Sequence, residues 1–115
     1  MHSLVMHKDR EDVFPGTLQM LILSTLLRGP LHGYAIAKEI QRRSEDQLQV
    51  EEGSLYPALQ RLLRKGFVTA EWVSAGPKRR ARVYKLTPVG RKEVAIEVDS
   101  FTGLIRATLR VIRST

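Results

Sequence analysis

A turn signal between two strand-like segments most constrains the fold of this chain. Ser74–Pro77 has the composition of a turn, and the flanking segments, Phe67–Val73 and Ala81–Leu86, are rich in β-branched and aromatic residues. This pattern predicts a β-hairpin. The remaining segments show helical spacing of apolar residues, and 115 residues supply one hydrophobic core. We therefore expect one mostly α-helical domain that carries a single small hairpin.

The segment after Gly16 predicts the first helix. Thr17 is the expected cap, apolar residues recur at helical spacing from Leu18 onward, and Gly29-Pro30 ends the helix. This segment is apolar nearly all round, so we expect it to be buried on more than one side, in the core or against a second subunit. Residues 1–13 show no such period and are expected to form a flexible arm.

Two further helices are expected before the hairpin. The second begins after Leu31–Tyr34 and ends at Ser44, and the third begins at Val50–Ser54 and ends at Gly66. Leucines mark one side of the third helix as its core side. The other side carries small residues near the start of the helix and basic residues further along, as a helix docked in a DNA groove needs. The residues expected on that outer side are Ser54, Ala58, Arg61 and Lys65. Pro57 removes one backbone donor, so the helix start is expected to be tight or irregular.

Basic charge is concentrated in one segment. The chain has 19 Lys and Arg residues against 12 Asp and Glu residues, a net charge of +7. The whole surplus lies between Gly76 and Lys92, where no acidic residue occurs. This segment includes the expected hairpin tip and returning strand. It predicts an arm that contacts phosphates, with a solvated loop as the alternative.

The last segment predicts a long helix. Thr87-Pro88 is a helix start, with Thr as the cap and Pro at the first helical position, and the helix is expected to run to about Arg113. Its apolar residues follow spacings of four and three residues, a seam of heptad type. The seam consists of Val94, Val98, Phe101, Ile105, Thr108 and Ile112. Gly103 weakens the middle and allows a bend. We favour a dimer seam over packing on the chain's own domain, because little other core is left for so long a helix to cover.

The composition argues against several classes of function. The chain has no cysteine, which excludes disulfides, zinc fingers, iron–sulfur clusters and thiol catalysis and favours a cytoplasmic location. Two of the three histidines lie in the expected arm, and His32 is expected to be structural, so no metal, no cofactor and no enzymatic activity is expected. No apolar run approaches the roughly 20 residues that cross a bilayer, so no membrane partner is expected.

The order of these elements is the layout of a winged helix, a helix-turn-helix followed by a hairpin. Three stretches resemble PadR-family transcriptional regulators in matching order: LHGYAI at Leu31–Ile36, GSLYPAL at Gly53–Leu59 and VYKLTPVG at Val83–Gly90. The resemblance covers roughly Thr17 to Val94. It indicates a winged helix-turn-helix followed by a long C-terminal helix, as in the short members of the family.

The resemblance implies a bacterial, cytoplasmic repressor that binds double-stranded DNA at an inverted-repeat operator as a homodimer. The chain would then divide into a flexible arm (1–13), a winged-helix DNA-binding domain (14–87) and a C-terminal dimerisation helix (88–115). The residues expected to contact DNA are Tyr34, Ser54, Tyr56, Pro57, Arg61, Lys65, Lys78, Arg79 and Arg80. The residues expected to form the dimer interface are Leu18, Ile22, Val94, Val98, Phe101, Ile105 and Ile112.

Some members of this family bind aromatic or drug-like effectors at the dimer interface, in certain cases between tryptophans of the last helix. This chain departs from that pattern, because its single tryptophan, Trp72, lies in the hairpin, where we expect a packing role. A small hydrophobic effector is instead expected against Phe14 and Phe101.

Several alternatives stay open at this point. Arg61 can contact guanine or phosphate, and Tyr34 and Tyr56 can be core aromatics or DNA contacts. A winged-helix protein-interaction module and a non-specific nucleic-acid binder are the other functions considered. The basic segment Gly76–Lys92, which has no acidic residue, favours DNA.

Overall fold

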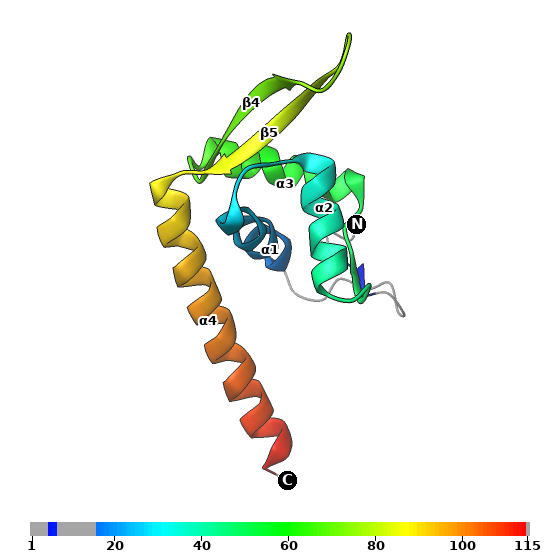
Figure 1. Cartoon of the computed structure of the whole chain (residues 1–115). Coiled ribbons are helices and arrows are strands. Elements are labelled where there is room, and N and C mark those ends of the chain that lie inside the picture. Colours follow the sequence, from blue (N-terminus) through cyan, green and yellow to red (C-terminus); the bar gives the residue numbers. More distant parts are fainter. Residues whose placement is uncertain (1–4, 7–15, 115) are drawn as a thin grey trace.

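The computed structural model describes residues 5–6 and 16–114 (Figure 1). The elements in chain order are β1 (Val5–Met6), α1 (Thr17–Thr25), the 3₁₀ turn η1 (Leu26–Arg28), β2 (Leu31–His32), α2 (Gly33–Arg43), β3 (Leu48–Gln49), α3 (Glu52–Arg64), β4 (Val68–Ser74), β5 (Arg80–Leu86) and α4 (Pro88–Arg113). The expected fold class, mostly helical with a small hairpin followed by a long helix, is confirmed. In the part of the chain described, no helix combines the length and apolar character that crossing a membrane requires.

The strands form two small antiparallel sheets. The hairpin of β4 and β5, here called the wing, pairs from Val68 opposite Leu86 to Ser74 opposite Arg80. β2 adds to the other edge of β5, with Leu31 opposite Tyr84. β1 pairs with β3, so the expectation of an arm without regular structure was wrong for residues 5–6. The rest of that arm lies outside the described residues.

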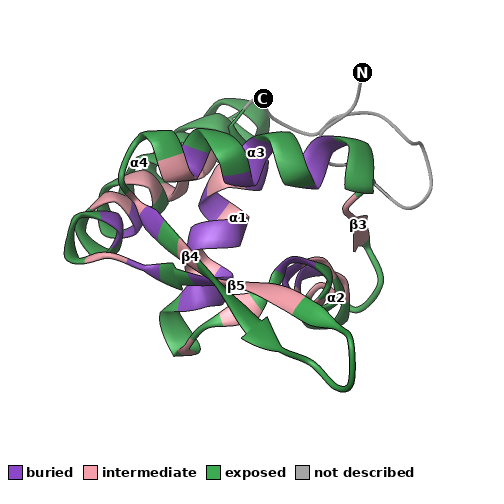
Figure 2. Cartoon of the chain, turned by 90° about the horizontal axis from the view of Figure 1, so that it is seen from above, coloured by how far each residue is buried: buried purple, intermediate pink, exposed green. Residues whose placement is uncertain are grey.

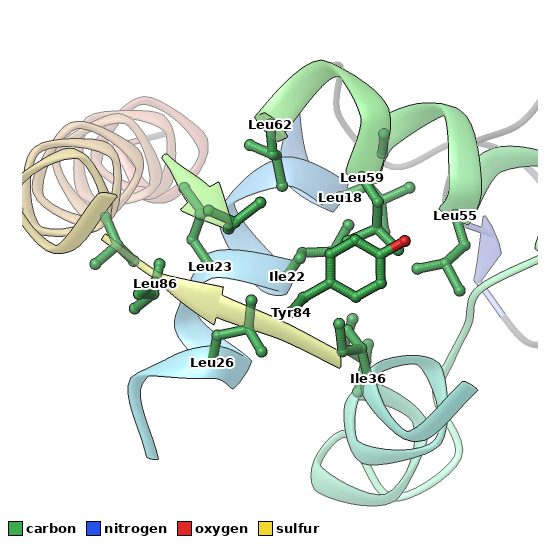
Figure 3. Packing of buried hydrophobic residues seen from close by; sticks show 14 residues of the cluster. Leu18, Ile22, Leu23, Leu26, Ile36, Leu55, Leu59, Leu62, Tyr84 and Leu86 are labelled. Atoms are coloured by element: carbon green, nitrogen blue, oxygen red, sulfur yellow. The ribbon is translucent and has the colours of Figure 1, made fainter. Parts of the chain in front are cut away.

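Helix α1 lies at the centre of the fold, where α2, α3 and α4 contact it (Figure 1). Gly16 with φ 82° precedes the helix and no side chain caps it, so the expectation that Thr17 caps α1 was wrong. Leu18 and Ile22 are buried in the core with the leucines of α3 (Figure 3). Both were expected at a dimer interface. That expectation was wrong, because the chain's own helices cover them.

The junction between the wing and α4 is closely bonded. Thr87 caps α4 as expected, because its Oγ1 accepts a hydrogen bond from the Gly90 N–H at 3.0 Å. The same hydroxyl donates to the Gly66 carbonyl oxygen at 2.7 Å, and the Thr87 N–H donates to the Phe67 carbonyl oxygen at 3.1 Å. Four backbone positions at the ends of α3, β4 and α4 are thereby held together.

Helix α4 lies against the rest of the described chain from its start to about Ile105, and its last residues project beyond the core. It spans 26 residues without a break, and Gly103 does not interrupt it. Val94 is 3% exposed and belongs to the chain's own core, which corrects its expected place in the dimer seam. Residues 106–114 are all exposed. The wing and the end of α4 project from opposite ends of the core, which gives the molecule extents of 61 × 32 × 23 Å (Figure 1).

Candidate DNA-binding surface

Helix α3 presents a narrower outer face than its sequence suggested. Two adjacent columns of residues point inward, and they include Ser54 at 7% and Ala58 at 1% exposure. The expectation that these two residues lie on the outer side was therefore wrong, and Ser54 has little surface to offer a groove. The buried and exposed residues alternate along α3 in Figure 2. The exposed outer face consists of Gly53, Tyr56, Pro57, Gln60, Arg61 and Arg64.

Gln60 and Arg64 were missed as candidate site residues. Each lies on the same side of α3 as Gly53, seven and eleven residues further along, which the helical period places on one face. Anchoring the helical period on the buried Leu55 and Leu59 would have found them. The helix runs through Pro57 without interruption, and its start is tight, because the Ser54 N–H donates to the carbonyl oxygen three residues earlier at 3.0 Å.

Lys65 is held away from this face. Its Nζ donates to Gln19 Oε1 at 3.2 Å, and Gln19 Nε2 donates to Glu97 Oε2 at 2.8 Å. Burial raises the pKa of Glu97, and a hydrogen bond with Glu93 raises it further. This polar chain ties the end of α3 to α1 and α4, so Lys65 has an intramolecular role that its position in the sequence did not indicate.

The start of α2 is built against α3. His32 caps the helix, with Nδ1 accepting a hydrogen bond from the Ala35 N–H at 3.3 Å, in agreement with its expected structural role. Gly33 packs so closely that an added Cβ would lie 2.9 Å from the Tyr56 ring. Tyr34 is 56% exposed, and the Lys38 ammonium lies 5.3 Å from its ring centroid. Tyr34 and Tyr56 are thus both accessible on the outside of the helix pair.

The wing carries the basic cluster beyond the core. Lys78, Arg79 and Arg80 are all exposed around its tip, and Lys78 adopts a φ of 63° in the turn. Trp72 is 57% exposed, so its expected packing role is not in the core. It stacks instead with two arginines: the Arg80 Cζ lies 5.2 Å and the Arg82 Cζ 5.8 Å from the Trp72 ring. Arg82 was not among the expected contact residues.

Other charged groups are neutralised locally. Glu39 binds Arg42 at 2.7 Å and Arg43 at 3.1 Å on the exposed side of α2. The hydrogen bond from Arg42 lowers the pKa of Glu39 to about 2. Among the described residues, no group of three or more His, Cys, Asp or Glu side chains gathers as a metal site would require.

Helix α4 carries an apolar face that the described chain leaves open. Of the residues expected in the dimer seam, Val98 and Ile112 are exposed, and Phe101 and Ile105 are half-buried. Leu104 and Leu109 are exposed beside them, as is Val111. The seam predicted from the sequence is therefore open to a partner from Val98 onward.

A cavity of about 380 Å³ lies between the start of α1 and α4. Apolar side chains from both helices line it: Met20, Ile96, Phe101 and Leu104. Phe101 was expected to contact an effector. Phe14, the other residue expected there, lies outside the described residues.

Comparison with known proteins decides the family. Residues 22–96 match the Transcriptional regulator PadR-like family. The chain belongs to this family. The sequence is 36% identical over 84 residues to uncharacterized protein X of Lysinibacillus sphaericus, a match that covers 71% of this chain and 75% of that protein. It is 30% identical over 77 residues to the negative transcriptional regulator PadR of Bacillus subtilis, covering 67% of this chain and 42% of that regulator.

Solved structures of PadR-like regulators have the same fold. A transcriptional regulator from Clostridium thermocellum superposes with a TM-score of 0.78 at 26% identity, covering 85% of this chain and 92% of that one. Bacillus subtilis PadR, solved in complex with operator DNA, superposes with a TM-score of 0.66 at 28% identity, covering 71% of this chain and 46% of that one. PadR-like proteins are transcriptional regulators and not enzymes, in agreement with the expectation from the sequence.

Proposed function

We propose that this PadR-like chain is a sequence-specific regulator that binds double-stranded DNA, with the outer face of α3 in the major groove and the wing on the adjacent backbone. The observation that carries the proposal is the convergence of these surfaces: Tyr34 of α2, Tyr56 of α3 and Trp72 of the wing line one hollow. Figure 2 shows α2, α3 and the wing on the side that faces the viewer. A helix and a basic arm so placed can contact base edges and phosphates together.

The proposal includes a homodimer that forms through α4. A row of large apolar residues that are exposed or half-buried on a projecting helix is the pattern of a helix–helix interface. Val98, Phe101, Ile105 and Ile112 are the residues we assign to it, and residues 88–115 are the dimerisation segment. A twofold dimer presents two α3 helices, so its operator would be an inverted repeat with half-sites about 34 Å or a multiple apart.

Repression is the regulatory outcome we propose, in the cytoplasm, where bacterial DNA lies. The support is the Bacillus subtilis relative described as a negative transcriptional regulator, of whose length this chain covers 42%. We further propose that a small hydrophobic effector enters the cavity beside Phe101 and releases the DNA. Compounds of this class should raise the melting temperature and weaken DNA binding. A panel without either effect would remove the effector from the proposal.

The experiment that tests the function is selection from a randomised double-stranded DNA pool, followed by sequencing and by fluorescence-anisotropy titrations at two salt concentrations. Recovery of an inverted repeat would support the proposal. Salt-sensitive binding without an enriched motif would replace it with non-specific DNA binding. Absence of binding at low salt would replace it with a protein-interaction module.

A matched pair of variants sharpens this experiment. Arg61→Ala removes a basic group from the outer face of α3, and Lys65→Ala removes one that is bonded to Gln19. Arg61→Ala should weaken operator binding by about 1–3 kcal/mol, selectively at one base pair if it reads guanine. A uniform loss across sequences would make Arg61 a phosphate contact. Equal losses for the two variants would contradict the assigned outer face.

A further inference from the structure

The inner face of the wing continues the sheet's buried face beyond the core. Side chains alternate along a strand, so every second residue of β4 and β5 shares this face. Near the core it carries Val68, Tyr84 and Leu86, all buried. Further out, the same face carries Trp72, which lies opposite Arg82 in the register. The wing therefore turns an aromatic and arginine-rich surface, and not only its tip, toward the helices.

Arg82 is held in place on this face. Its Cζ lies 5.8 Å from the centroid of the Trp72 ring and 5.9 Å from that of Tyr84, so the two aromatic rings confine the guanidinium. Its Nε is buried and has no hydrogen-bond partner among the described residues. Because this Nε is shielded from solvent, only the terminal Nη groups of the Arg82 guanidinium can donate to a group outside the chain.

A hollow of about 260 Å³ lies beside these groups. The start of α2, the exposed side of α3 and the wing all contribute to its lining, which includes Tyr34, Tyr56, Trp72, Arg80 and Arg82 and no acidic residue. Arginine guanidinium groups and tyrosine hydroxyl groups are hydrogen-bond donors. An anion with several acceptor oxygens is the ligand that such a lining suits.

We propose that this hollow seats one phosphate group of the DNA backbone, with Arg82 and Arg80 as its donors and Trp72 as the residue that positions both. The inference rests on the proposed DNA-binding function and adds the contact that fixes the wing relative to α3. A planar guanidinium can stack on Trp72 and still present several N–H groups to phosphate, which a lysine ammonium cannot do. A phosphate held here would set the register of α3 in the groove without reading sequence.

The test compares two arginine-to-lysine variants, which keep the charge: one in the proposed seat and one on α4, outside the wing. Arg82→Lys should weaken binding about tenfold or more on every duplex sequence, because the stacked, directed donor is lost. Arg110→Lys, on the exposed polar side of α4, should change the affinity less than about twofold. Circular-dichroism melting of both variants checks that each remains folded. Full affinity of Arg82→Lys would overturn the proposal, since only charge would then matter.

The single tryptophan supplies a direct readout, because Trp72 lies in the proposed seat. Adding duplex DNA should change its emission in the wild-type protein and much less in Arg82→Lys. Millimolar inorganic phosphate should leave the emission unchanged, and a saturable response to it would overturn the assignment to DNA in favour of a free anion. Operator binding that survives in Arg82→Lys would refute this inference alone, whereas a wild-type protein that binds no DNA would refute the proposed function as well.

Discussion

Replacing Gly90 with alanine tests how α4 joins the winged helix. A Cβ at Gly90 would lie 2.0 Å from the carbonyl oxygen of Phe67 and 2.9 Å from its carbonyl carbon. Both are backbone atoms, so no side-chain rotation relieves the contact. The start of α4 would have to move away from β4 by about an ångström, and that movement would strain the hydrogen bonds that join Thr87 to Gly66, Phe67 and Gly90.

The size of the effect follows from these contacts. Overpacking of a closed site costs about 1–3 kcal/mol, and contact with rigid backbone belongs at the upper end. Weakening the cap of α4 adds about 1 kcal/mol to this destabilisation, and the better helix propensity of alanine offsets about the same amount. The free energy of unfolding should therefore fall by about 3 kcal/mol. In a chain of this length, that corresponds to a fall of roughly 10 °C in melting temperature.

Gly103→Ala is the matched control, because Gly103 lies in the same helix with nothing within 4 Å of its would-be Cβ. It should gain helix propensity alone and stabilise the protein by up to about 1 kcal/mol. Urea denaturation followed by circular dichroism, at one fixed protein concentration, measures both variants. A Gly90→Ala variant as stable as the wild type would refute the reasoning, as would equal shifts for the two glycines.

Three further predictions concern α4. Thr87→Ala should lower the free energy of unfolding by about 1–2 kcal/mol through loss of the cap, and Thr87→Ser should recover most of it in the same urea assay. Burial and the bond with Glu93 raise the pKa of Glu97, so its contribution to the free energy of unfolding is present below pH 4.5 and is lost as the pH rises through the raised pKa. Urea titrations across pH should show this loss of stability in the wild-type protein and much less of it in Glu97→Gln. Ile112→Glu should give monomers by sedimentation, whereas Arg110→Glu, on the polar side of α4, should leave the association unchanged. Monomers from both variants, or from neither, would contradict the apolar face of α4 that we assign to the dimer.

Local signals in the sequence were sufficient to predict much of the fold. The turn at Ser74–Pro77 gave the wing, and the Thr87-Pro88 pair gave the start of α4, because turns and caps depend on a few neighbouring residues. The two-residue strands β2 and β3 were missed. Each is too short to show a period of two, and each forms only because a distant strand lies beside it.

The candidate site was predicted less completely, for a different physical reason. A pattern of apolar residues says that a face is covered but not what covers it, so Leu18, Ile22 and Val94 were assigned to a partner when the chain's own helices bury them. For a related reason, Lys65 was predicted to contact DNA although it is bonded to Gln19, and Arg82 was not predicted although it lies in the hollow. Their surroundings are set by Trp72 across the hairpin and by Gln19, 46 residues away, and neither contact leaves a local signal.

The way α3 is joined to α4 bears on how a dimer would read DNA. The end of α3 is bonded to α4 through Thr87 at one point and through Gln19 at another, the second contact passing from Lys65 to Glu97. Two bonded points restrict rotation as well as translation. If α4 forms the proposed twofold interface, the separation of the two α3 helices is therefore fixed by these junctions. Glu97 also lines the cavity between α1 and α4. A molecule that entered there would act on the second junction directly, without having to reach α3.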